Sequence, residues 1–226
     1  MTWIDLGNPI PHETPLQHKP YEWPVTDIEY LVEPKELALP SLEKVISTRR
    51  TRRTFAPLDQ AHLAAFLWLS CRTIARGTNR LGFSITQRPY PSSGAIHPIH
   101  LLISDNKGGF RRYDPDRHAL TTLESKNGSF IGIWQSISQV LEPERSTALV
   151  LAAEPAKIYT KYKFGNSLIW RDAGVLIGHM SLVSTGLNLN FCPLGITGEP
   201  WVSGLDKNGN LVGVGVALLG SRPINS

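Results

Sequence analysis

The stretch LPSLEKVISTRRTRRTF, residues 39–55, joins a helix signal to four arginines in five positions. Ser41 can accept a hydrogen bond from the first turn of a helix through SLEKVISTR. Beyond that helix Arg49, Thr51 and Arg53 alternate, so in extended backbone their side chains project to one side. Two guanidiniums with a hydroxyl between them match a phosphate monoester, whose oxygens accept charge-assisted bidentate hydrogen bonds. We therefore predict a phosphate-binding segment directly after a short helix.

Two other interpretations of the arginine cluster stay open. A solvated helix end explains the charge without a ligand. A nuclear-targeting or nucleic-acid-binding patch is disfavoured, because the neighbouring Ile46, Phe55 and Leu58 are core-type residues and no aromatic side chains alternate with the charges.

Composition excludes several classes of protein. The net charge of +4 and the pI near 9.1 come from Lys and Arg spread along the chain, which does not favour a nucleic-acid partner. Cys71 and Cys192, the two cysteines, stand among apolar neighbours, so we expect neither disulfides nor a cysteine-rich metal site. There is no charged leader and no run near the roughly 20 apolar residues of a membrane span. We expect a cytoplasmic protein with no membrane partner.

Residues 1–40 contain seven prolines, which exclude long helices and favour an extended arm. Their aromatic and aliphatic residues argue against disorder. We predict a proline-rich N-terminal arm, residues 1–40, that wraps its own domain or a partner subunit. The second predicted unit is one domain, residues 41–226.

That domain mixes helices and strands around one core, which defines an α+β fold. Asp59 can cap a second helix whose apolar residues recur at helical spacing up to Ile74, with Gly77 ending it. FRRYD and HALTTL form a short hairpin between turn residues. Other expected elements are helices over residues 129–141 and 168–187, buried strands at 98–104 and 147–154, and a central strand at 211–220.

The second candidate binding motif is PSSGAIHP, residues 91–98. Ser92 and Ser93 offer hydroxyls and backbone N–H groups, and Gly94 allows a ring or phosphate to approach the main chain. The alternative is a polar turn before a strand. His97 and His100 would point to opposite faces of that strand, so we predict no metal site. No dinucleotide, Walker-type or hydrolase-elbow motif is present.

In order, these segments resemble the FMN-dependent nitroreductase superfamily, and within it the SagB-type branch of azoline dehydrogenases. The resemblance runs from about Leu39 to Pro223. It depends on LPSLEKVISTRRTRRTF, with Thr51 where the family has Ser, on PSSGAIHP, and on the hairpin GGFRRYDPDRHAL, residues 108–120, which is specific to this branch.

The resemblance implies a nitroreductase-like mixed, mainly antiparallel sheet flanked by helices, in an interlocked homodimer with two FMN sites at the subunit interface. Phosphate and ribityl contacts would come from Arg49, Arg50, Thr51, Arg53 and Arg222. Residues Pro91, Ser92, Ser93 and Gly94 would come from the partner subunit. The segment FCPLGITG, residues 191–198, would place Leu194, Gly195 and Ile196 beside the isoalloxazine ring.

Azoline dehydrogenases also carry a Lys-Tyr pair before a helix that begins with Asp or Glu, Ala, Gly and His. The matching residues here are Lys161 and Tyr162, followed by Asp172, Ala173 and Gly174. The spacing is about one residue shorter than the family pattern, and Val175 replaces the histidine. An alternative register would place Lys163 and Phe164 at the pair.

The expected activity is oxidation of thiazoline or oxazoline rings in a peptide or carrier-bound natural-product intermediate, with oxygen reoxidising the flavin. Aromatising such a ring removes a proton and a neighbouring hydride, so the site needs a base beside a hydride acceptor. Lys161 or Tyr162 would act as the base, and a cyclase or carrier protein is a possible partner. Two alternatives are an NAD(P)H-dependent reductase of nitroaromatics or quinones and a non-catalytic flavoprotein-like subunit.

Overall fold

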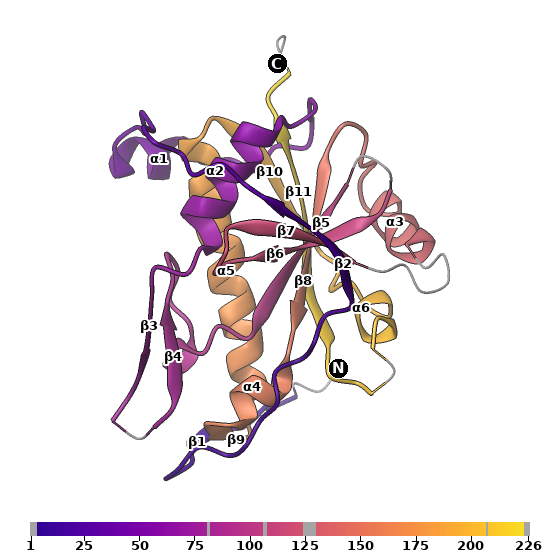
Figure 1. Cartoon of the computed structure of the whole chain (residues 1–226). Helices are drawn as coiled ribbons and strands as arrows, with labels where there is room; N and C mark the ends of the chain where they lie inside the picture. Colours follow the sequence, from indigo (N-terminus) through magenta and orange to yellow (C-terminus); the bar gives the residue numbers. More distant parts are fainter. Residues whose placement is uncertain (1–3, 81, 106–107, 124–129, 207, 224–226) are drawn as a thin grey trace.

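In the computed structural model, which describes residues 4–80, 82–105, 108–123, 130–206 and 208–223, a seven-stranded sheet lies between two layers of helices (Figure 1). The strand order is β10-β11-β8-β5-β6-β7-β2, and each pairing within it is antiparallel. The sheet strands are β2 (Val25–Tyr30), β5 (Ile99–Ser104), β6 (Phe110–Asp114), β7 (Ala119–Leu123), β8 (Thr147–Ala153), β10 (Leu189–Leu194) and β11 (Val212–Ser221).

Alternating residues of the sheet build two hydrophobic layers, as the period of two in a strand requires. On β8, Leu149 and Leu151 face α2 (Gln60–Cys71) and α5 (Asn166–Gly186), whereas Val150 faces α3 (Ile131–Ser138) and α6 (Trp201–Gly204). Because both faces are covered, β8 and β11 are apolar along almost their whole length. The strands predicted at 98–104 and 147–154 and the FRRYD–HALTTL hairpin are confirmed, while β11 is second from the edge rather than central.

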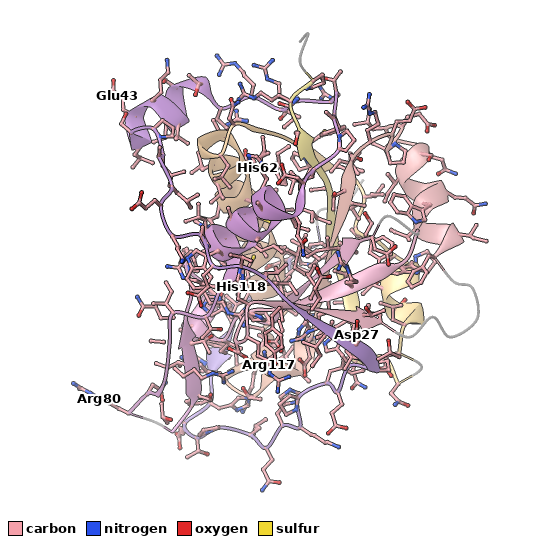
Figure 2. All side chains as sticks on the ribbon, turned by 45° about the horizontal axis from the view of Figure 1, so that its top comes forward. Asp27, Glu43, His62, Arg80, Arg117 and His118 are labelled. Carbon is pink, nitrogen blue, oxygen red and sulfur yellow. The ribbon has the colours of Figure 1, made fainter. Side chains whose placement is uncertain are left out.

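Both predicted helix caps are present. Ser41 Oγ accepts a hydrogen bond from Lys44 N at the start of α1 (Leu42–Thr48), and Asp59 accepts one from the backbone N of His62, the residue labelled on α2 in Figure 2. The predicted extension of α2 toward Gly77 is wrong. The chain leaves the helix after Cys71, because the backbone N–H of Thr73 and that of Ile74 bond carbonyls of other segments.

Helix α5 positions most of the candidate site. Its 21 residues span about 32 Å at 1.5 Å per residue, and it runs along one face of the sheet from α4 (Pro155–Tyr159) to α2 (Figure 1). The helix predicted at 168–187 is confirmed, and its residues Ile169, Ala173, Leu176 and Met180, at helical spacing, are all buried. Asn188, just beyond the helix, has a φ of +58°, as expected of a residue that ends a helix.

The N-terminal arm pairs with its own chain. Strand β1 (Ile10–Pro11) pairs with β9 (Tyr162–Lys163), and Leu16 N donates to Thr160 O at 3.0 Å. Farther along, β2 forms one edge of the main sheet. A second two-stranded ribbon, β3 (Ala75–Thr78) with β4 (Ser84–Gln87), lies apart from the sheet at the left of Figure 1.

Candidate functional site

The turn Ser92–Ser93–Gly94 is anchored by a buried carboxylate of α5. Asp172 accepts hydrogen bonds from Ser92 Oγ at 2.6 Å, from Ser93 Oγ at 2.8 Å and from the Ser93 backbone N at 3.0 Å. Ser92 Oγ in turn accepts one from His97 N at 2.9 Å. Charge-assisted bonds of this kind are short and strong, so the turn is held rigidly at the first third of α5.

Gly94 sits at the centre of the turn in a left-handed conformation, with φ +63°. A Cβ added there would lie 2.6 Å from Lys161 Nζ and 3.0 Å from Tyr162 Oη. The glycine therefore allows the amine and the phenol to approach the main chain closely. Lys161 Nζ also lies 3.5 Å from Gly94 O.

The Lys161–Tyr162 segment is itself supported on both sides. The arm residue His12 donates its backbone N–H to Lys161 O at 2.8 Å, and Lys161 Nζ lies 5.4 Å from the centre of the Phe83 ring. Burial, followed by the charge of Asp172, raises the pKa of Tyr162. The phenol therefore stays protonated at neutral pH and can donate a hydrogen bond.

The alternative pair of the sequence pattern, Lys163 and Phe164, is exposed to solvent. Of the Phe164 surface, 65% is accessible. Val175, which stands where the family pattern has His, is 39% exposed on α5. The geometry around Gly94 thus involves Lys161 and Tyr162 rather than the next two residues.

The arginine segment follows the open side of edge strand β10. The backbone N–H of Arg52 donates to Phe191 O at 3.1 Å, and Asn190 Nδ2 donates to Thr54 O at 2.8 Å. Arg49 is partly buried, whereas Thr51 and Arg53 are exposed. Among the described residues, none of the arginines from 49 to 53 forms an ion pair.

Arg50 differs from its neighbours. Its Nη1 donates to Arg49 O at 2.8 Å and lies 3.5 Å from Ser47 O, at the C-terminal end of α1. A cation at this end of a helix interacts favourably with the helix dipole. This contact accounts for Arg50 without a ligand.

Arg222 comes to the same end of the sheet as the arginine segment. Ala56 and Ser221 form an antiparallel bridge with both N···O distances at 2.9 Å, which brings the end of β11 beside residues 53–56. Arg222 is exposed and, within the ranges given above, forms no ion pair. The arginine segment and Arg222 together place guanidiniums that lack an ion-pair partner among the described residues at the same end of the sheet.

Leu194, Gly195 and Ile196 lie where β10 ends. Phe191, whose carbonyl accepts the hydrogen bond from Arg52 N, precedes Leu194 by three residues, which is about 10 Å of strand. Gly195 is exposed and the side chains on either side are half-buried. The arginine segment and this loop therefore form one continuous surface along the edge of the sheet.

The Ser92–Gly94 turn does not reach this surface within one chain. The turn is bonded to Asp172, whereas α1 packs against Gly186, where an added Cβ would lie 3.8 Å from Val45 Cγ2. The 14 residues between those two points of α5 span about 21 Å. The structure thus brings Lys161 and Tyr162 to the turn, and Arg222 to the arginine segment, as two separate groups. Figure 1 shows the corresponding elements, β9 and α1, toward opposite ends of α5.

Asp172 is the site residue whose role the sequence did not reveal. It appeared as part of a family pattern, and its serine partners lie 79 and 80 residues away. The available signal in the sequence was an acidic residue on the otherwise apolar face of a helix. In the structure this residue is 97% buried.

The described ranges contain no group of three or more His, Cys, Asp or Glu side chains placed to hold a metal ion. His97 Nε2 contacts Thr86 O, while His100 Nε2 contacts Glu154. None of the helices described is long and apolar enough to cross a membrane.

No protein-family model matches this chain, and the search of curated proteins gave no significant match. Solved structures do match. A Ralstonia eutropha protein assigned as a nitroreductase superposes with a TM-score of 0.61 at 19% identity, over 92% of this chain and 97% of that chain. A chain of the Escherichia coli microcin synthetase McbBCD complex, with truncated pro-MccB17 bound, gives 0.59 at 17% identity, over 86% and 78%.

A nitroreductase family protein from Clostridium novyi gives a TM-score of 0.52 at 15% identity, over 82% of this chain and 87% of that chain. At such identities the likeness concerns the arrangement of helices and strands. The predicted α+β architecture is confirmed by these superpositions together with the antiparallel sheet and its two helical layers. The chain has the nitroreductase fold.

Proposed function

We propose that this protein is an FMN-dependent dehydrogenase that oxidises azoline rings to azoles, working as a cytoplasmic homodimer in natural-product biosynthesis. The observation that carries the proposal is the position of the Lys161 amine and the Tyr162 phenol, 2.6 and 3.0 Å from the Cβ that Gly94 lacks. A base and a hydrogen-bond donor thus meet side by side against the backbone of Gly94.

The residues present fit FMN. The arginine segment and Arg222 expose guanidiniums that lack carboxylate partners among the described residues, as a phosphate site requires. In the proposed site, Arg49, Thr51, Arg53 and Arg222 hold the phosphate and ribityl chain. The backbone of Leu194–Ile196, about 10 Å along β10, borders the ring system.

A second copy of the chain completes the proposed site. Within one chain the turn Ser92–Gly94 is bonded to Asp172, and α1, which leads into the arginine segment, packs beside Gly186, about 21 Å farther along α5. A two-fold dimer can place the turn of one subunit beside the arginine segment of its partner. The twin sites then each take Pro91–Gly94, Lys161 and Tyr162 from one chain and the arginines from the other.

When bound, FMN supplies a hydride acceptor. Lys161 would accept the proton from one carbon of the azoline ring, and the hydride from the neighbouring carbon would pass to the flavin. The Tyr162 phenol, which burial keeps protonated, donates a hydrogen bond to the ring heteroatom or amide. With molecular oxygen as the final acceptor, one azoline and one O₂ give one azole and one H₂O₂.

The likeness to a chain of the McbBCD complex supports a peptide substrate, because that complex was solved with a truncated pro-peptide bound. Its multi-subunit nature also supports a partner such as a cyclase or a carrier protein. The substrate class of this protein is proposed on that basis.

The experiment uses a synthetic peptide that contains a single thiazoline. Protein reconstituted with FMN should convert the peptide to the thiazole, with a mass loss of two hydrogens and release of one H₂O₂ per ring. Lys161→Ala should lower turnover by about 10²- to 10⁴-fold, the usual contribution of general base catalysis, while flavin absorbance is retained. Lys163→Ala is the matched control, since its side chain is exposed two residues away. Equal activity of both variants would remove Lys161 from the mechanism.

An NAD(P)H-dependent reductase is the second candidate, favoured by the fold that this chain shares with assigned nitroreductases. Anaerobic mixing with NADPH distinguishes the two. Rapid bleaching of the flavin supports the reductase, whereas a spectrum that bleaches only with the thiazoline peptide supports the dehydrogenase. A colourless protein that cannot be reconstituted with FMN would support a non-catalytic subunit.

A further inference from the structure

A cavity of about 460 Å³ lies beside the Lys161–Tyr162 segment but shares no residue with the arginine segment or with the loop after β10. Its walls come from the arm (Pro15–Tyr21), the β3–β4 ribbon and the sheet. Sequence motifs did not predict it, because many separate segments between Pro15 and Leu176 build it.

The cavity exists because two neighbouring strands separate. β5 and β6 pair from Ser104–Phe110 to Leu102–Arg112, and no pairing continues beyond that point although both strands do. His100 and Tyr113 lie past the end of the paired region and line the cavity. The unpaired ends of β5 and β6 therefore border the cavity beneath the arm.

Three cations line this cavity and form no ion pair within the described residues. Arg88 hydrogen-bonds the Tyr90 hydroxyl, Arg112 lies 5.9 Å above the Trp23 ring, and Lys157 Nζ lies 3.5 Å from His97 O. The Nε atoms of Arg88 and Arg112 are buried and have no hydrogen-bond partner in the part of the chain described. Buried guanidinium donors of this kind cost free energy unless an acceptor meets them.

The carboxylates of the cavity are already engaged. Arg76 forms an ion pair with Asp116. Glu154 accepts hydrogen bonds from His18 Nε2 at 2.8 Å, Tyr21 N at 2.7 Å and His100 Nε2 at 3.0 Å. With both histidines neutral, the lining residues carry a net charge of +2.

The cations also act on each other. Burial lowers the pKa of Arg112 and that of Lys157. Carboxylates partly offset this, Asp114 first for Arg112 and Glu154 first for Lys157, and the charge of Arg88 lowers both pKa values further. Like charges held together in a partly desolvated space repel, and an anion between them would relieve that repulsion.

We propose that this cavity is a binding site for a phosphate monoester with a small apolar body, separate from the proposed flavin site. The two charges of the phosphate match the net +2, and Arg88, Arg112 and Lys157 supply donors of the type that phosphate oxygens accept. The apolar body packs on Phe83, Ile85, Ile96 and Leu101, which line the same space. A monocarboxylate of equal size leaves one positive charge uncompensated and binds more weakly.

The test is calorimetric titration of protein saturated with FMN, using phenyl phosphate as the probe and phenylacetate as the monoanion. We expect one phenyl phosphate per chain and weaker binding of phenylacetate. Arg112→Gln and Arg88→Gln should each weaken phenyl phosphate binding by about tenfold or more, the usual effect of losing a charged hydrogen-bond donor. The matched control is Arg80→Gln, because Arg80 points away from the molecule at the tip of the β3–β4 ribbon (Figure 2).

Two outcomes would overturn the proposal. One is phenyl phosphate binding that Arg112→Gln leaves unchanged, and the other is phenylacetate binding as tightly as phenyl phosphate. If Arg88→Gln does not fold, Arg112→Gln and Lys157→Gln carry the comparison, with thermal shift as a second measure. Binding that is lost in Arg53→Gln instead would place the probe at the arginine segment and would also overturn the cavity site. Flavin absorbance, recorded separately, reports on the proposed FMN site alone.

Discussion

Asp172, buried on α5, accepts a hydrogen bond of 2.6 Å from Ser92 Oγ across 80 residues of sequence. The same carboxylate bonds Ser93, so one side chain fixes the conformation of the whole turn. The position of Gly94, and with it the contact to Lys161, depends on this anchor.

Replacing Asp172 with Asn should lower the free energy of unfolding by about 1–3 kcal/mol, because the amide group cannot accept all three bonds and leaves a buried donor unpaired. Urea denaturation measures the change. Arg171→Gln is the control, since that side chain is exposed on the same turn of α5. Equal stability of the two variants would show that the turn is held by other contacts.

Replacing Gly94 with Ala tests the close approach of Lys161. Left-handed backbone costs a residue with a Cβ about 1–2 kcal/mol, and the new methyl group would also displace the Lys161 amine. Gly209→Ala carries the same backbone strain, with φ +71° against +63°, but its Cβ would meet nothing within 4 Å. We expect similar losses of stability in the two variants, and a loss of thiazoline turnover in Gly94→Ala alone. Turnover that falls equally in both would indicate strain as the cause.

Replacing Arg53 with Gln should weaken FMN binding by about 10- to 100-fold, the effect of losing one charge-assisted bond to phosphate. Quenching of flavin fluorescence during titration measures the affinity. Arg50→Gln is the control, because Arg50 already donates to backbone carbonyls at the end of α1. A larger effect of Arg50 than of Arg53 would reverse the proposed assignment.

The stability of the protein should fall as the pH drops from 6.5 toward 4. Burial lowers the pKa of His100 to about 4, so in this window the unfolded chain binds a proton that the folded chain does not. Below pH 4.5, Glu154 also makes the stability fall as the pH drops. Burial raises its pKa, but hydrogen bonds from His100 and Tyr21 N outweigh burial and bring it to about 2.

Denaturation at pH 7, 6 and 5 tests this. His100→Gln should make the dependence of stability on pH shallower by up to about 1.4 kcal/mol per pH unit, the value for one proton. Burial also lowers the pKa of His97, to about 3, so part of the slope should remain. An unchanged slope in His100→Gln would contradict the assignment.

The elements that the sequence predicted are those whose residues are buried in a regular pattern. β5, β8 and β11 are nearly continuous apolar runs, and α5 has a stripe at helical spacing. β3 was missed because all four of its residues are exposed, so no alternation marks it. The sequence analysis assigned part of this segment to an extended α2. The actual end of α2 is determined by backbone N–H groups that donate hydrogen bonds to carbonyls distant in sequence.

The candidate site was predictable only where its residues are adjacent in sequence. The Ser92–Gly94 turn and the arginine segment are local motifs. The contacts that give them their geometry, from Asp172 to the turn and from Arg52 to Phe191, join segments 79 to 139 residues apart and leave no local pattern. The site assignments themselves remain predictions that the variants above test, and the homodimer is part of the proposal.

The β1–β9 ribbon has a practical consequence for anyone preparing this protein. Ile10 and Pro11 are strand partners of Lys163 and Tyr162, so these two arm residues support a loop that is distant in sequence. Trimming them as a dispensable tail, or fusing a bulky tag close to them, would loosen that loop and depress measured rates for reasons unrelated to chemistry.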